Sequence, residues 1–225
     1  MNGVKRAIYR SCVLAVKAYQ HAFMDVRVRG RTHIPPGPKI YASNHISAFD
    51  GLWIMPVFTE PVCYVIGPQY KFGLLARVFD AYDQINAMPH RRGSVVDDAV
   101  DRLERGRSVY ICPEGDLQDQ STLGRFYPGV ARMYLRTRVP IIPIALVAPK
   151  RYMREYPFPT VVDGRVYRCV VFLRGPFFVN VGEPMWPDAD DEATDQDREA
   201  SVLSTLKDRI AALVDDARRN KFWRG

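Results

Sequence analysis

Four short apolar runs, separated by helical patterns, constrain the fold of this 225-residue chain more than any other feature. The runs are KIYAS (39–43), PVCYVIG (61–67), SVYICPEG (108–115) and VPIIPIALV (139–147). Short apolar runs bounded by Gly and Pro are typical of strands buried in a sheet. Because helical patterns alternate with them, they indicate an α/β fold, in which a layered, mixed and largely parallel sheet is flanked by helices.

The helices between these runs are predicted from periodicity and end signals. A helix through Leu52 and Met55 is followed by helices over 71–79, 94–105 and 128–136. In 94–105 the apolar residues fall on one face, and Gly106 follows, as glycine commonly does just beyond a helix C-terminus. Residues 165–182 are rich in strand formers and predict an antiparallel hairpin at the sheet edge.

Amphipathic helices are predicted at both ends of the chain. Residues 4–24 carry basic residues on one flank, so this helix either packs on the domain or rests on an anionic membrane. An acidic, exposed linker is predicted over 188–199, before a final helix. That helix ends in RRNKFWRG (218–225), where the cations near Phe222 and Trp223 suit either a lipid interface or the helix dipole. The predicted apolar stripes are Ile8, Cys12, Val16, Tyr19 and Phe23, and Leu203, Leu206, Ile210, Leu213 and Ala217.

Length and composition predict a single domain over residues 1–225. Its parts are an N-terminal amphipathic helix region (1–29), a core (30–187), and an acidic linker with the C-terminal helix (188–225). The longest run without a charged residue, 139–149, is shorter than the roughly 20 residues of a membrane span. No signal-peptide cleavage site follows the basic N-terminus. We therefore expect a cytoplasmic protein, soluble or peripheral on the inner face of a membrane.

Charge and cysteine content narrow the class of partner. The net charge of +7 favours phosphate-bearing partners, among them anionic lipid surfaces. Nucleic acid is the least favoured, because no basic-aromatic groove or recognisable binding module is present. The four cysteines and four histidines lack metal-ligand spacing, so we predict no metal, and we expect the cysteines to be free, buried thiols.

The stretch YASNHISAFDGLW (41–53) carries the strongest candidate for chemistry. Ser47 and Asp50 fit a capping box ahead of the apolar run LWIM, which would make His45 an ordinary loop residue. Alternatively, if the helix begins near Ser47, the ring of His45 can fold back onto Asp50. A carboxylate that holds one imidazole nitrogen leaves the other as a general base. The cap and the dyad are compatible.

Four blocks in order decide between these interpretations. NHISAFD resembles the NHxxxxD block of the glycerolipid acyltransferases of the lysophosphatidate acyltransferase type. ICPEGD, FYPGVARM and VPIIPIAL resemble that family's FPEG block, the stretch after it, and its VPIIPV strand block. The resemblance covers about residues 30–187, and four ordered blocks are far more specific than any one of them.

The resemblance implies that a fatty acyl group moves from a thioester, acyl-CoA or an acylated carrier protein, onto a lipid hydroxyl. His45 would be the general base and Asp50 would orient it; no serine or cysteine nucleophile is required, and no cofactor beyond the thioester co-substrate is expected. Asn44, Glu114 and Gly115 would contact the substrate. Lys71 and the basic N-terminal helix are candidates to meet donor phosphates.

The sequence departs from the family pattern where a phosphate would be held. The family's EGTRS is EGDLQ here (114–118), so its arginine is missing, and the second block reads NAMPHRR. Arg91 falls where the family's other arginine is expected, with Arg92 beside it, and both are predicted to bind substrate. Two alternatives stay open: the same O-acyl transfer onto a non-glycerophosphate acceptor, such as a glycolipid, or a catalytically idle module that binds lipid or carrier protein.

Overall fold

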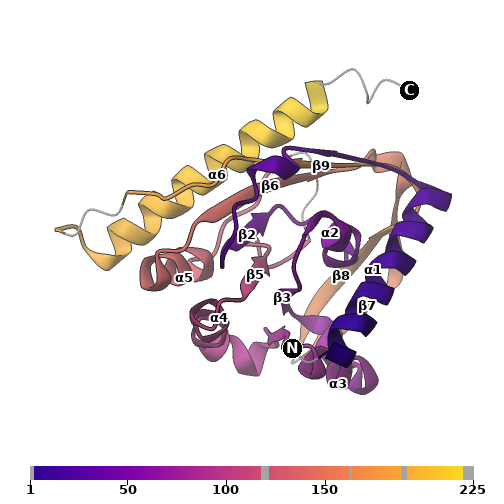
Figure 1. Cartoon of the computed structure of the whole chain (residues 1–225), viewed down its shortest axis with the longest axis horizontal. Coiled ribbons are helices and arrows are strands. Elements are labelled where there is room, and N and C mark those ends of the chain that lie inside the picture. The colour runs from indigo at the N-terminus through magenta and orange to yellow at the C-terminus, as the bar shows by residue number, and fades with distance from the viewer. Residues whose placement is uncertain (1–2, 118–121, 163, 189–191, 220–225) are drawn as a thin grey trace.

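A computed structural model describes residues 3–117, 122–162, 164–188 and 192–219 as a sheet between two layers of helices (Figure 1). The main sheet has seven strands in the order β1-β9-β6-β2-β5-β3-β4. The strands are β1 (Met24–Arg29), β2 (Ile40–Ser43), β3 (Val62–Ile66), β4 (Ile85–Asn86), β5 (Ser108–Ile111), β6 (Ile141–Val147) and β9 (Gly175–Val181). The four apolar runs of the sequence form β2, β3, β5 and β6, as predicted.

The sheet is largely parallel, which confirms the predicted fold class. The five neighbouring strands β6, β2, β5, β3 and β4 run parallel to one another. Strand β9 pairs antiparallel with β6 and parallel with β1, so these two strands run in the opposite direction. A separate antiparallel pair consists of β7 (Met153–Val162) and β8 (Arg165–Phe172).

Helices cover both faces of the main sheet. Helices α4 (Val95–Glu104), α5 (Gly129–Thr137) and α6 (Asp195–Arg219) lie on one face, and α1 (Gly3–Phe23) and α2 (Asp50–Ile54) lie on the other (Figure 1). Helix α3 (Gly73–Ala81) lies beside the β7–β8 pair. Short 3-10 turns complete the fold: η1 (Arg31–His33), η2 (Met55–Val57), η3 (Pro68–Lys71), η4 (Pro89–Ser94) and η5 (Lys150–Tyr152). Within the described residues, no helix is long and apolar enough to cross a bilayer.

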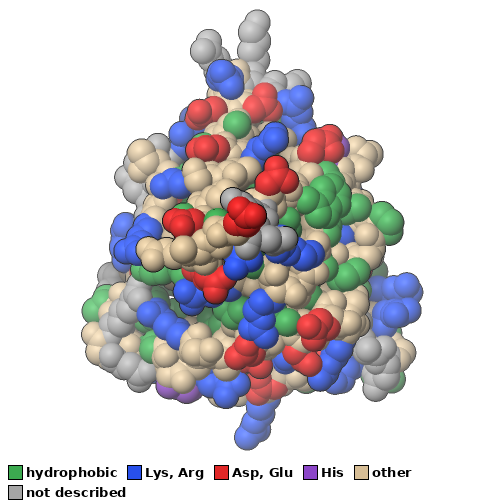
Figure 2. Space-filling model, turned by 90° about the vertical axis from the view of Figure 1, so that its left-hand side faces the viewer, with side chains coloured by type: hydrophobic (Ala, Val, Ile, Leu, Met, Phe, Trp, Pro, Cys, Tyr) green, Lys and Arg blue, Asp and Glu red, His purple; other side chains and the backbone are tan. Residues whose placement is uncertain are grey.

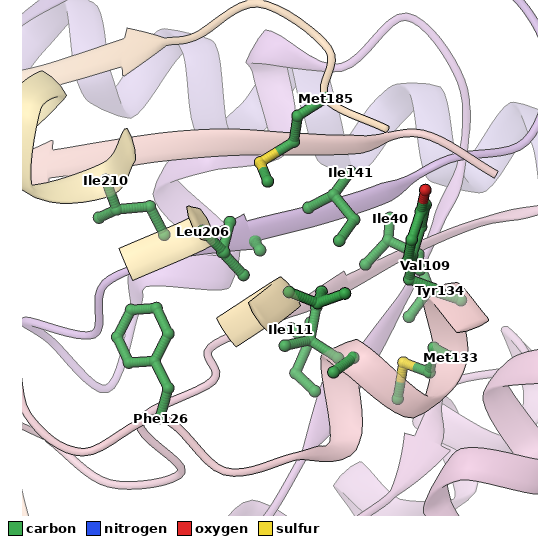
Figure 3. Packing of buried hydrophobic residues seen from close by; sticks show 14 of the residues in the cluster. Ile40, Val109, Ile111, Phe126, Met133, Tyr134, Ile141, Met185, Leu206 and Ile210 are labelled. Atoms are coloured by element: carbon green, nitrogen blue, oxygen red, sulfur yellow. The ribbon is translucent and has the colours of Figure 1, made fainter. Parts of the chain in front are cut away.

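Two hydrophobic cores result from the alternation of side chains along the strands. Ile40 and Ile141 point to the face of α4, α5 and α6, where they pack with Leu206 and Ile210 (Figure 3). Tyr41 and Ile142, one residue further along each strand, point to the face of α1 and α2. The central strands are therefore buried on both sides, which explains why they appear in the sequence as continuous apolar runs.

Several elements differ from the prediction. β1 and β7 were not predicted, and the predicted hairpin over 165–182 is wrong: β8 pairs with β7, whereas β9 joins the main sheet. The acidic segment is a linker only in part, because α6 begins at Asp195. Thr194 caps it, since its Oγ1 accepts the backbone N–H of Asp197 at 3.2 Å. Residues 189–191 of that segment, Gln118, Phe222 and Trp223 lie outside the described residues.

The predicted N-terminal helix is present, but only part of its apolar stripe packs: Val16 is buried and Tyr19 packs against the same core. Val16 and Gln20 are its buried residues, and Gln20 Nε2 donates to the carbonyl of Trp53 at 2.7 Å. Ile8 and Phe23 are exposed, as is Cys12, so the expectation that every cysteine is buried is also wrong; all four are free thiols. Charges of both signs are interspersed on the face in Figure 2, so the excess of cations is not gathered there.

Candidate active site

The candidate site lies beyond the carboxyl ends of the two central strands β2 and β5. These strands run parallel with Ala42 opposite Ile111, so the residues that follow them emerge side by side. The loop after β2 contains Asn44 and His45, and the loop after β5 contains Cys112 and Glu114. The carboxyl edge of a parallel sheet is where α/β proteins commonly bind ligands.

His45 and Asp50 meet in the geometry that the sequence suggested. His45 Nδ1 lies 2.8 Å from Asp50 Oδ2, and the Asp50 side chain is fully buried. The same oxygen accepts the backbone N–H groups of Ile46, at 2.7 Å, and Ser47, at 2.9 Å. Ser47 Oγ in turn accepts the N–H of Phe49 at 3.2 Å. Only half of the predicted capping box forms, the bond from the Ser47 N–H to Asp50, because α2 begins at Asp50 with Phe49 as its N-cap and no side chain caps it.

The hydrogen bonds of Asp50 define which nitrogen of His45 faces outward. An ionised carboxylate only accepts hydrogen bonds, so Nδ1 carries the proton in this contact, and in the neutral ring Nε2 keeps its lone pair. The side chain is 24% exposed and lines the cavity described below. Burial of the ring opposes its charged form. The Cys112 sulfur and the Asp50 carboxylate outweigh burial, so the pKa of His45 is raised well above 6.5.

Cys112 is a neighbour of His45 that sequence reasoning missed. Its side chain is half-buried, and its sulfur favours the charged form of the His45 ring. Cys112 Sγ also lies 3.7 Å from Ser43 Oγ and 3.6 Å from Tyr110 Oη. The signal that could have found it is the parallel register, which sets Cys112 beside Ser43 one position beyond the last β2–β5 pair.

Glu114 ties the loops of the site together. It is only 2% exposed, so its carboxylate lies inside the protein and not on an exposed turn. Its carboxylate accepts the backbone N–H groups of His45, at 2.8 Å, and Gly124, at 2.7 Å. Burial raises the pKa of Glu114 above 4.5, and the two N–H donors offset this only in part.

Gly115 forms a tight turn after β5. Its φ is +64°, a conformation that favours glycine, and a Cβ there would lie 3.2 Å from the ring of Tyr127. The Gly115 N–H donates to the carbonyl of Cys112 at 3.0 Å and closes the turn. Gly115 therefore sets the path of the chain that carries Cys112 and Glu114.

Asn44 joins the loop after β2 to strand β6. Its Nδ2 donates to the carbonyl of Leu146 at 2.8 Å, and its Oδ1 accepts the Leu146 N–H at 2.7 Å. Both ends of the amide are thus engaged with backbone. Asn44 lines the cavity described below, and the expectation that it contacts substrate stays a prediction.

The β7–β8 pair holds the same loop from its other side. The N–H of Phe172 donates to Ser47 Oγ at 3.1 Å, and the N–H of Ala48 donates to the carbonyl of Val170 at 2.8 Å. The indole N–H of Trp53 donates to the carbonyl of Phe172 at 2.8 Å. The segment from Ser47 to Trp53 is therefore fixed to the edge of β8.

A cavity of about 300 Å³ opens beside His45. Its wall combines apolar side chains with a few polar and charged groups, and a large part comes from α6, which sequence reasoning did not connect with the site. The cations of α6 that face it are Lys207 and Arg218, with Asp215 between them. The lining residues are Asn44, His45, Ile46, Glu114, Thr122, Leu123, Leu146, Val147, Lys207, Ala211, Val214, Asp215 and Arg218.

The two predicted phosphate-binding arginines are not among the residues that line this cavity. Arg91 and Arg92 lie in η4, where Arg91 approaches Asp98 at 3.4 Å and Arg92 approaches the hydroxyl of Tyr167 at 3.4 Å. Lys71 donates to the carbonyl of Val161 at 2.8 Å. In the part of the chain that the structure describes, no cluster of His, Cys, Asp and Glu could hold a metal ion.

Comparison with known proteins agrees with this architecture. The chain is similar to the crystal structure of PlsC, the 1-acyl-sn-glycerophosphate acyltransferase of Thermotoga maritima, with a TM-score of 0.71 and 17% identity over 98% of this chain and 85% of PlsC. At this low sequence identity, the similarity shows a shared fold and nothing more.

Two chloroplastic 1-acyl-sn-glycerol-3-phosphate acyltransferases are similar in sequence: BAT2 of Brassica napus (26% identical) and LPAT1 of Arabidopsis thaliana (25% identical). Each match spans 147 residues, 59% of this chain, but only 40% of BAT2 and 39% of LPAT1. The family model described as Acyltransferase matches residues 25–147, which include His45, Asp50 and Glu114. The chain belongs to the acyltransferase family.

Proposed function

We propose that this protein transfers a fatty acyl group from a thioester to the hydroxyl of a lipid acceptor, with His45 as general base. The observation that carries the proposal is the 2.8 Å contact between His45 Nδ1 and the fully buried Asp50 carboxylate, beside a cavity. Asp50 fixes the ring and stabilises its charged form. This arrangement is what activation of a hydroxyl nucleophile requires.

The transfer step follows from the tautomer of His45. The acceptor hydroxyl gives its proton to Nε2, and its oxygen attacks the thioester carbonyl. The carbon–sulfur bond of the donor then breaks, and the departing thiolate recovers the proton. Both acyl-CoA and acylated carrier protein supply such a thioester, and the proposal covers both donors.

The cavity supports an acceptor or donor that is partly apolar and partly anionic. Ile46, Leu123 and Val147 offer an apolar wall, where each buried methylene contributes about 0.8 kcal/mol. Lys207 and Arg218 line the same cavity and can meet a phosphate. We propose that these α6 cations take over the role of the arginine missing from EGDLQ. A glycerophosphate lysolipid is then the first acceptor to test, and a glycolipid is the second.

A surface around α3 supports attachment to a lipid bilayer, where such an acceptor is found. No residue of α3 is buried, and Leu74 is 77% exposed. The neighbouring Phe72, Leu75 and Val78 are exposed as well. These four residues, of which Phe72 directly precedes the helix, are called the α3 surface. Apolar side chains on one short helix, near the basic residues Lys71 and Arg77, suit an interface with anionic lipid.

The test is thiol release from palmitoyl-CoA, and from palmitoylated carrier protein, with a panel of acceptors: lysophosphatidate, glycerol 3-phosphate, other lysolipids and a glycolipid. We expect acceptor-dependent release that is lost in His45→Ala and kept in His90→Ala, which removes an exposed histidine outside the site. Equal, acceptor-independent release in wild type and His45→Ala would refute the proposal and favour an idle binding module.

A further inference from the structure

We infer that Tyr110 is a positioning residue for the proposed transfer: its hydroxyl, through Ser43, holds the backbone that carries His45. This inference deepens the proposed function and rests on it. Neither Tyr110 nor Ser43 is among the residues that line the cavity, so both act on the reaction without touching a substrate.

Three tyrosines lie in one row across the middle of the main sheet. Tyr110 of β5 lies opposite Tyr41 of β2 on one side and opposite Tyr64 of β3 on the other. All three are buried in the core that faces α1 and α2, and the ring centroids of Tyr64 and Tyr110 are 5.3 Å apart. Because burying a hydroxyl costs free energy unless it forms a hydrogen bond, the partner of each hydroxyl indicates its role.

The three hydroxyls have different partners. Tyr110 Oη lies 2.6 Å from the Oγ of Ser43, the last residue of β2. Tyr41 Oη donates at 2.9 Å to the carboxylate of Glu60, two residues before β3 and therefore at the opposite end of the strands. Among the described residues, the hydroxyl of Tyr64 has no hydrogen-bond partner. Of the three, only Tyr110 therefore bonds to the segment that leads into the candidate site.

The protons of these groups run in one direction. Ser43 Oγ donates its one proton to the carbonyl of Asn44 at 2.9 Å, so it accepts the proton of Tyr110. The oxygen of Tyr110 in turn accepts the S–H of Cys112 at 3.6 Å. Burial raises the pKa of Tyr110 well above 10, so the phenol keeps the proton that it donates. Since Ser43 and Tyr110 are both buried, bulk water cannot replace these bonds.

The end of this relay is the peptide bond that enters His45. Ser43 holds its carbonyl, on Asn44, and the Glu114 carboxylate holds its N–H, on His45, at 2.8 Å. A peptide unit is planar, so fixing both of its polar groups fixes the plane and the start of the His45 residue. The 2.8 Å contact of the His45 ring with Asp50 depends on that placement. Misplacing a reacting group by about 1 Å can slow a reaction about 100-fold.

The row of tyrosines supplies its own controls. In the thiol-release assay with the whole chain and the best donor and acceptor of the panel, we expect Tyr110→Phe to lower kcat by about tenfold or more and to leave KM unchanged. Tyr41→Phe loses a hydrogen bond to a carboxylate, so it should lower Tm at least as much but keep kcat. Tyr64→Phe should keep both. An equal loss of kcat in Tyr41→Phe and Tyr110→Phe would reduce the effect to general stability and overturn the inference.

A second variant tests whether Tyr110 acts through Ser43. Ser43→Ala removes the donor to the Asn44 carbonyl and should lower kcat at least as much as Tyr110→Phe. Because the two hydroxyls form one chain, the double variant should be no slower than Ser43→Ala alone. A double variant whose loss is the product of the two single losses would show that Tyr110 acts by another route, and would overturn the inference.

Hydrogen exchange of the His45 backbone N–H, followed by NMR, tests the positioning without any substrate. Exchange should be faster by about tenfold or more in Tyr110→Phe and Ser43→Ala, and close to wild type in Tyr64→Phe. Unchanged exchange in Tyr110→Phe would overturn the inference while acyl transfer by wild type stands. If wild type transfers no acyl group with any donor and acceptor, the proposed function fails, and faster exchange in Tyr110→Phe would still show that this hydroxyl holds the His45 backbone.

Discussion

The Glu114 carboxylate accepts the backbone N–H of His45 at 2.8 Å and thereby joins two loops that lie 69 positions apart in the sequence. Its other oxygen accepts the N–H of Gly124 at 2.7 Å, so a third segment is held at the same point. Both side-chain oxygens of Glu114 accept a hydrogen bond. A carboxylate can do this, whereas an amide has only one acceptor oxygen.

Replacing Glu114 by Gln should therefore loosen the site while the side chain keeps its size. One of the two N–H donors would face an amide NH2 group, and we expect the free energy of unfolding to fall by about 1–3 kcal/mol. Urea unfolding measures this. Glu104→Gln, an exposed residue at the end of α4, is the matched control and should change stability little. Equal stability of both variants would contradict the bridging role of Glu114.

The raised pKa of His45 predicts how stability depends on pH. The folded protein holds the His45 proton more tightly than the unfolded chain, so the contribution is complete below pH 6.5. It is lost as the pH rises from 6.5 through the raised pKa of the folded state. In Cys112→Ala one partner that raises the pKa is gone, so the loss should occur over a narrower range of pH. NMR titration of the His45 ring, with unfolding measured across the same range, checks this; identical titrations would contradict it.

Asp50→Asn tests the orienting role of the carboxylate. An amide can place its NH2 group toward Nδ1, which would favour the wrong tautomer of His45 and leave Nε2 protonated. We expect turnover to fall by about 10³–10⁴-fold, the order seen when the equivalent aspartate is changed in a serine protease triad. Steady-state kinetics with the best acceptor measures the loss. A fall of less than about tenfold would mean that orientation by Asp50 is not required.

The cations of the cavity predict a change in acceptor affinity. Lys207→Ala should raise the KM for a phosphate-bearing acceptor by about tenfold, as expected for the loss of a charge-assisted hydrogen bond, and change the KM for a neutral acceptor little. Arg105→Ala, an exposed cation beyond α4, is the control. A larger effect from Arg91→Ala or Arg92→Ala than from Lys207→Ala would restore the assignment suggested by the sequence.

The α3 surface predicts which part of the protein contacts an anionic membrane. Leu74→Asp should weaken co-sedimentation with anionic vesicles by about tenfold or more, because burying one leucine contributes about 1.5–3 kcal/mol. Binding should also weaken as salt rises, since anionic lipid attracts the neighbouring cations. Leu14→Asp is the comparison, because Leu14 is 65% exposed on α1. If only Leu14→Asp releases the protein, α1 and not α3 contacts the lipid.

Much of the fold could be predicted because its central strands are buried on both faces. β2, β5 and β6 show this directly as apolar runs. β1 (MDVRVR) pairs only with β9, which lies about 150 residues further along the chain, and its alternating pattern has half its side chains exposed. β7 contains Pro157 and Pro159, and proline argues against a central strand. Proline is tolerated in β7 because this strand belongs to a two-stranded sheet, in which only one of its edges pairs with another strand.

The candidate site could be predicted where it is local, or where a block of the family resemblance contains the residue, as for Glu114. His45 and Asp50 lie five positions apart, so one stretch of sequence contains the contact. Cys112 reaches His45 through the register of two strands, and Lys207 reaches the cavity through the docking of α6. Neither of these two contacts can be recognised from a short stretch of sequence. The stripe of α1 held only in part: Val16 packs, but the packed face also carries Gln20, whose hydrogen bond to Trp53 no apolar periodicity predicts.

The attachment of the His45 loop to β8 limits how a substrate can enter. Three hydrogen bonds join this loop to the backbone of β8 at residues 170–172, and they come from Ser47, Ala48 and Trp53. Without them this edge of β8 would have unpaired backbone groups. If this loop swung away as a lid, it would expose those groups and break three hydrogen bonds at once. The wall formed by α6 is not held by these three hydrogen bonds, so it is the part of the cavity that can move without exposing β8.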